Sequence, residues 1–142
     1  MLGIFVKAPW PSFYKKGMKS WEIRSYPTDY RGDVLFIESG SNKTICKMTL
    51  IDCIPLSKKR WEMNYEKHRT SCSYENLPYR KGESPAYAWV LDKPFLLSNP
   101  PVIQRHNSQP CVELSNSIIS TCTLSPITFS PERLACKFIG DT

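Results

Sequence analysis

Residues 17–24 read GMKSWEIR and are dense with polar side chains. Gly17 is expected to end a short helix, and the residues after it lead into a strand. Side chains alternate between the two faces of a strand, so Glu22 and Arg24 share one face, about 7 Å apart. Lys19 lies just before them, at the mouth of the strand. We expect the stem of Lys19 to stand outside the core.

This polar face predicts either a binding cleft or a surface ion pair. Lys and Arg side chains can hold a phosphate or carbonyl oxygen, and a Glu accepts a hydrogen bond from a donor such as the edge of a base. An ion pair across an exposed strand face is common and contributes little to stability. The spacing of the residues leaves both interpretations open.

The rest of the chain predicts a mainly β, mixed α+β domain. Short β-branched and aromatic runs alternate with turns, and the chain holds 12 Pro and 6 Gly. Two short helices are expected at residues 11–16 and 57–69. This order predicts a small mixed β-barrel with helices at its ends rather than a βαβ sheet. The expected strands cover residues 2–7, 20–26, 34–38, 44–54, 87–91, 95–97 and 111–114.

Length and composition are those of one ordinary globular domain. The chain has 142 residues, of which 41% are hydrophobic and 23% are charged. No apolar run is long enough to cross a membrane, and the first residues do not form a secretory signal. We therefore expect no membrane contact and a cytoplasmic location. The net charge of +6 favours anionic partners such as nucleic acid, although a solubilising surface charge explains it equally well.

The six cysteines predict neither a metal site nor a disulfide framework. None of them forms a CxxC pair, so the common zinc spacings are missing and no cofactor is expected. A catalytic Cys needs a partner, usually His, and the sequence brings neither His68 nor His106 to a thiol. Trp61, Tyr65 and His68 share one face of the expected second helix, which makes His68 a half-buried or surface residue rather than a ligand.

The polar stretch matches the GxKxxExR motif of ASCH domains, which are members of the PUA-like superfamily. Further matching pieces follow the family's order, and together they make the resemblance more specific than the motif alone. They are residues 9–10 (PW), 30–34 (YRGDV), 86–91 (AYAWVL) and, faintly, 109–114. The resemblance covers roughly residues 3–114. It implies a PUA-like β-barrel with a cleft that holds the motif.

Residues 115–142 have no counterpart in that family. They are rich in Ser and Thr, yet they hold too many apolar residues for a solvated tail. We therefore expect an ASCH domain over residues 1–114 and a C-terminal extension over residues 115–142 that packs on it.

The resemblance also implies a function in binding RNA or single-stranded nucleic acid. One branch of the family is similar to metal-independent amidohydrolases that remove the acetyl group of N4-acetylcytidine, and another is reported to act as a ribonuclease. When the motif of this branch is aligned with residues 17–24, the catalytic Lys of the amidohydrolases corresponds to Lys19. Their catalytic Thr corresponds to Glu22. Glu is a poor replacement for a hydroxyl nucleophile, although it can act as a general base on water. Glu62 and Glu66 match the later Glu of that branch only by rough position.

Binding of RNA, of single-stranded nucleic acid or of a modified nucleoside is the function we favour. A hydrolase in the same cleft is the alternative, with Lys19 and Glu22 catalytic, and a protein-interaction module is the second alternative. Tyr87 and Trp89 share a face and either stack on a base or fill the barrel core. We expect the motif residues to converge on one solvent-accessible cleft. The candidate ligand-binding residues are Lys19, Glu22, Arg24, Arg31, Tyr87 and Trp89.

Overall fold

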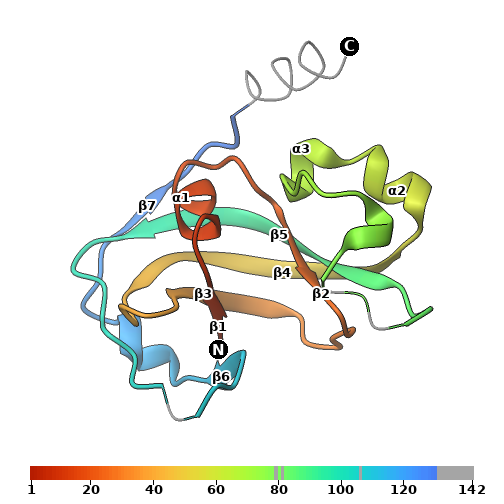
Figure 1. Cartoon of the computed structure of the whole chain (residues 1–142). Coiled ribbons are helices and arrows are strands. Elements are labelled where there is room, and N and C mark those ends of the chain that lie inside the picture. The colour runs from red at the N-terminus through yellow and green to blue at the C-terminus, as the bar shows by residue number, and fades with distance from the viewer. Residues whose placement is uncertain (79, 81, 106, 131–142) are drawn as a thin grey trace.

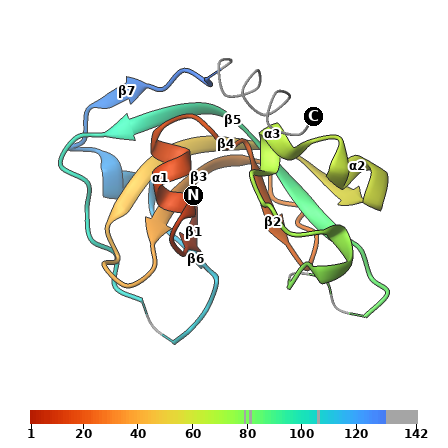
Figure 2. The same cartoon turned by 45° about the horizontal axis from the view of Figure 1, so that its top comes forward.

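One curved sheet is the largest element of the computed structural model, which describes residues 1–130 apart from 79, 81 and 106. In that part of the chain seven strands run in the order β2-β5-β4-β3-β1-β6, and β7 pairs with β5. Figures 1 and 2 show the sheet curling into a half-barrel. The expected mainly β, mixed α+β class is confirmed. The strands are β1 (Leu2–Val6), β2 (Trp21–Arg24), β3 (Gly32–Glu38), β4 (Thr44–Leu56), β5 (Ala86–Leu97), β6 (Cys111–Glu113) and β7 (Leu124–Pro126).

Strand β3 shows why the sheet needs cover on both faces. It pairs in parallel with β1 and antiparallel with β4, and the four residues from Val34 to Ile37 are completely buried. A strand covered on both sides reads as a continuous apolar run. On one face Tyr14 of helix α1 (Trp10–Lys15) stacks on Phe36, with ring centroids 4.3 Å apart. We call the sheet face that carries Tyr14, Phe36 and Trp89 the α1 face.

Three short α-helices in the described residues replace the two that the sequence predicts. The helix expected over residues 57–69 is divided into α2 (Lys58–Glu62) and α3 (Tyr65–His68). The break falls at Asn64, whose side-chain amide donates to the Arg60 carbonyl, because Asn offers the backbone an alternative to helix hydrogen bonds. Two 3₁₀ turns are also present, η1 (Tyr74–Asn76) and η2 (Asn116–Ile119). Among the described residues no helix is long and apolar enough to cross a membrane.

The expectation that His68 is half-buried or on the surface is wrong. The residue is 1% exposed, and its ring lies flat on the Trp61 ring, with centroids 3.5 Å apart. The sequence pattern correctly groups these two side chains on one side. The break between α2 and α3 folds that side inward onto the sheet, so His68 is covered.

The chain after residue 114 returns to the sheet. Strand β7 extends the β5 edge, and Ile127 and Phe129 pack against the α1 face. Ser130 donates its backbone N–H to the Gly17 carbonyl, 3.2 Å away. Residues 131–142 of the expected extension lie outside the described residues.

Candidate functional site

Strand β2 is covered on both faces, and the two faces carry different chemistry. Trp21 and Ile23 point to one side and pack in an apolar cluster with Trp61. Glu22 and Arg24 point to the α1 face, as the alternation of the strand predicts. The motif carboxylate and guanidinium are therefore enclosed by the fold rather than displayed on an open surface.

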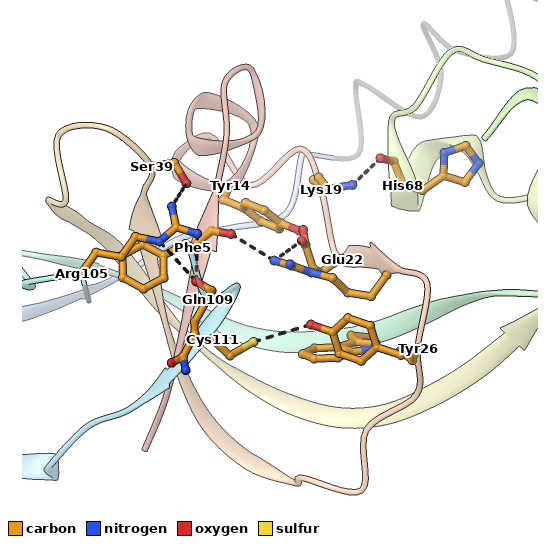
Figure 3. Close-up of polar contacts among 12 residues, drawn as sticks. Phe5, Tyr14, Lys19, Glu22, Tyr26, Ser39, His68, Arg105, Gln109 and Cys111 are labelled. Carbon is orange, nitrogen blue, oxygen red and sulfur yellow. Dashed lines mark hydrogen bonds and ion pairs between the residues drawn. The ribbon is translucent and has the colours of Figure 1, made fainter. Parts of the chain in front are cut away.

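Glu22 is the centre of a buried hydrogen-bond network (Figure 3). It is 5% exposed, and its Oε1 accepts a 2.6 Å hydrogen bond from the Tyr14 hydroxyl. Its Oε2 forms a 2.8 Å ion pair with Nη2 of Arg24, which also donates to the Phe5 carbonyl at 3.1 Å. Burial raises the pKa of Tyr14 well above its usual value, and the Glu22 charge raises it further. Tyr14 therefore remains a donor to Glu22 throughout the neutral range.

Lys19 is buried, so the expectation that its stem stands outside the core is wrong. The residue is 2% exposed. Its Nζ donates to the His68 carbonyl at 2.5 Å (Figure 3). It also lies 4.3 Å from the centroid of the Trp10 ring. Burial lowers the pKa of Lys19 to about 8, although the nearby Glu22 charge raises it. The carbonyl and the ring replace the water that a surface lysine would have.

Gly17 shows why the motif begins with glycine. Its φ is +69°, the left-handed conformation that ends helix α1, and a Cβ there would lie 2.4 Å from the Thr128 carbonyl oxygen. Both the turn and the close approach of the C-terminal segment therefore require the missing side chain. This turn directs Lys19 toward α3.

Arg24 lies between the buried network around Glu22 and a more exposed group of side chains, which are those of Tyr26, Cys111 and Arg105. Its Nε is buried and has no hydrogen-bond partner among the described residues. Nearby, the Tyr26 ring is 38% exposed, and its hydroxyl faces the Cys111 thiol at 4.0 Å. Figure 3 shows these two side chains pointing toward each other from β6 and from the end of β2. Arg105 stacks its guanidinium on the Phe5 ring, 4.3 Å from the centroid.

Sequence analysis missed two members of this group. Tyr26 has the same parity as Glu22 and Arg24, so the alternation of the strand could have indicated it. No pattern in the sequence indicates that Arg105 belongs to this group. It is placed by Phe5 and by the Gln109 carbonyl, which accepts from its Nη2 at 2.8 Å.

The structure brings some candidate residues together and leaves others apart. Trp89 lies opposite Glu22 and Tyr87 opposite Arg24 across the β2–β5 pair. Trp89 is 2% exposed, so of the two interpretations left open it fits the barrel core, while Tyr87 is half-buried.

The hydrogen bonds and the ion pair of Arg31 go to residues other than those of the motif. It bonds to the Thr28 and Tyr30 carbonyls and lies 3.9 Å from an Asp52 carboxylate oxygen. In the described part of the chain no group of three or more His, Cys, Asp or Glu side chains is arranged to hold a metal ion.

Comparisons with known proteins agree with the fold. The sequence profile of the ASCH domain matches residues 4–100. The crystal structure of ASCH from Zymomonas mobilis is similar with a TM-score of 0.65 at 16% identity, over 86% of this chain and 95% of that chain. A serine-to-alanine variant of the same protein gives 0.67 at 14% identity, over 86% and 96% of the two chains. At such identities the likeness shows the fold alone, and it confirms the fold expected from the motif. No curated protein matches the sequence.

Proposed function

The chain belongs to the ASCH domain family, and on that premise we propose that it binds single-stranded nucleic acid, RNA above all, beside Arg24 on the α1 face. One observation carries the proposal, namely the buried Nε–H of Arg24 that lacks a partner among the described residues. Leaving a buried donor unpaired costs about 1–3 kcal/mol, and more when the group is charged. A phosphate or base oxygen at this position would remove that cost.

The surroundings of Arg24 suit a nucleotide. Glu22 and the Phe5 carbonyl hold its guanidinium in one orientation, so little freedom remains to be lost when a ligand binds. The half-open Tyr26 ring offers a surface on which a base can stack. Arg105 adds a second positive charge on the other side of Phe5. A fixed donor, an aromatic surface and excess positive charge are the features that single-stranded nucleic acid needs.

Replacing Tyr26 by Ala should weaken binding of a short labelled RNA, because base stacking on an aromatic ring contributes about 1–3 kcal/mol. Tyr26→Phe is the matched control, since it keeps the ring and loses only the hydroxyl near Cys111. Fluorescence anisotropy should show a loss of roughly 5- to 150-fold for the Ala variant and a change within about twofold for the Phe variant. Wild-type affinity in Tyr26→Ala would show that Tyr26 is not part of the RNA site, whereas no RNA binding by the wild type would favour a protein-interaction module.

A hydrolase in the same region is the second candidate, and the lowered pKa of Lys19 favours it. An amine with a pKa of about 8 is partly deprotonated near neutral pH and can accept a proton. Against this, Lys19 and Glu22 already serve as partners of His68 and Arg24. Incubation with N4-acetylcytidine and with RNA distinguishes the candidates, because a binding module leaves both intact and an enzyme consumes one of them.

We also propose that residues 115–142 form an extension that stabilises the domain of residues 1–114. The packing of Ile127 and Phe129 on the α1 face supports this. A chain ending at residue 114 should lose roughly 2–3 kcal/mol of unfolding free energy, the contribution of two half-buried apolar side chains. Urea unfolding of the full and shortened chains measures the difference, and equal midpoints would contradict the proposal.

A further inference from the structure

The pairing between β1 and β6 reaches a point at which one backbone hydrogen bond cannot form. At its other end Met1 and Leu114 exchange both backbone bonds, at 2.8 and 2.9 Å. In an antiparallel pair such exchanges recur at every second residue, so Phe5 and Pro110 form another. The Phe5 N–H donates to the Pro110 carbonyl at 3.0 Å. The reverse bond to the Phe5 carbonyl is impossible, because proline has no N–H.

The Phe5 carbonyl that this leaves over is used by Arg24. The N–H and C=O of a strand residue point to the same side, so this carbonyl points away from β3 and toward β6. Nη2 of Arg24 donates to it at 3.1 Å. Figure 3 shows the Phe5 carbonyl on the side that faces Glu22. The guanidinium therefore supplies the donor that proline lacks.

This contact is one of two that hold Nη2 of Arg24 in place. Oε2 of Glu22 lies 2.8 Å from the same nitrogen, so its two hydrogens can have one partner each. With both partners the plane of the guanidinium is fixed, and the buried Nε–H keeps one direction. With Glu22 alone the guanidinium can turn about that contact.

Packing of the proline ring does not explain why Pro110 stands at this position. The residue is exposed, and it lies beyond residues 4–100, which match the ASCH profile. Arg105 fixes the chain just before it, because its Nη2 donates to the Gln109 carbonyl at 2.8 Å. A proline beside a strand costs the sheet one hydrogen bond. The property of Pro110 that the surroundings use is its missing N–H.

We propose that Pro110 is a positioning residue of the RNA site. Its missing N–H reserves the Phe5 carbonyl for Arg24, and this fixes the direction of the Nε–H that is offered to the nucleic acid. The proposal rests on the proposed function, because it concerns the same guanidinium.

Pro110→Ala restores the N–H and tests the positioning without any RNA. The new backbone N–H at position 110 should bond to the Phe5 carbonyl and be protected from hydrogen exchange as well as the Phe5 N–H is. In the NMR spectrum of the arginine side chains, the Nε–H signal of Arg24 should shift and exchange faster with water. An unchanged Arg24 signal, or an unprotected amide at position 110, would overturn the proposal.

Affinity for a short labelled RNA is the second readout. Pro110→Ala should weaken binding roughly 2- to 10-fold, the effect of one hydrogen bond. Pro100→Ala is the matched control, since Pro100 is exposed and lies outside the strands. It should leave RNA affinity and the Arg24 signal unchanged.

Stability separates positioning from a merely structural role. Both variants give the unfolded chain the same extra freedom, so both should lose a similar unfolding free energy. Pro110→Ala should lose no more than Pro100→Ala, because its new backbone hydrogen bond offsets the contact that Arg24 gives up. A larger loss of stability in Pro110→Ala, in step with its loss of affinity, would make the proline structural and overturn the proposal.

The two readouts also separate this proposal from the RNA site itself. If the wild type does not bind RNA, the proposed function fails, and the Arg24 signal still decides whether Pro110 positions the guanidinium. If the wild type binds RNA and Pro110→Ala binds it equally well, the RNA site stands and the role of Pro110 in it is overturned.

Discussion

Replacing Glu22 by Ala should lower the free energy of unfolding by about 3–5 kcal/mol, the cost of leaving one charge of a buried ion pair alone. Glu22 is 5% exposed and bonds at once to Tyr14 and Arg24. Its loss leaves the Arg24 guanidinium buried without a counter-charge and the Tyr14 hydroxyl without an acceptor. Urea unfolding followed by tryptophan fluorescence measures the effect.

Glu113→Ala is the matched control for this experiment. Glu113 is also a strand glutamate, but it is exposed on β6. Substitution of an exposed residue outside such a network should change the unfolding free energy by no more than about 0.5 kcal/mol. A loss of less than about 1 kcal/mol in Glu22→Ala would mean that the network contributes little to the fold.

The contribution of Lys19 to the stability of the protein should rise as the pH is raised from neutral into the alkaline range. The pKa of Lys19 is about 8 in the folded chain and returns toward 10.5 on unfolding. Between these values the unfolded chain binds more protons than the folded chain, so raising the pH favours the folded state. From pH 7.5 to 9.5 the contribution amounts to roughly 2 kcal/mol.

Lys19→Met should abolish this rise, since the variant has no group to titrate at that position. Lys59→Met removes an exposed lysine of α2 instead and should keep the rise of the wild type. Unfolding free energies at several pH values provide the comparison. Because Tyr14 and other groups titrate in all three proteins, the informative quantity is the difference between variant and wild type. Identical pH profiles for Lys19→Met and the wild type would contradict the burial of a charged Lys19.

Much of the sheet could be predicted from local patterns. The alternation in residues 20–26 correctly places Glu22 and Arg24 on one face, because a strand fixes the direction of every second side chain. The β-branched run at residues 44–54 likewise predicts β4. The expectation that the run at residues 95–97 continues the strand of residues 87–91 beyond Pro94 is confirmed by β5. Pro94 fits within this strand because it lies toward the edge that β7 covers and needs no N–H there.

The burial of Lys19 could not be predicted from its neighbours in the sequence. Its hydrogen-bond acceptor, the His68 carbonyl, is 49 residues away in the chain. The position of that carbonyl depends on the break at Asn64, which the helical pattern of Trp61, Tyr65 and His68 concealed. Contacts between distant segments therefore decide whether a motif residue meets solvent or the core.

The salt dependence of RNA binding tests the central claim most directly. A single-stranded RNA held by two to four phosphate contacts should lose affinity linearly on a double-logarithmic plot, with a slope of roughly −1.4 to −2.8. The measurement is an anisotropy titration of the wild-type chain between about 50 and 200 mM salt. The account predicts saturable binding with a slope in that range. No binding at the lowest salt concentration, or an affinity that does not change with salt, would contradict it.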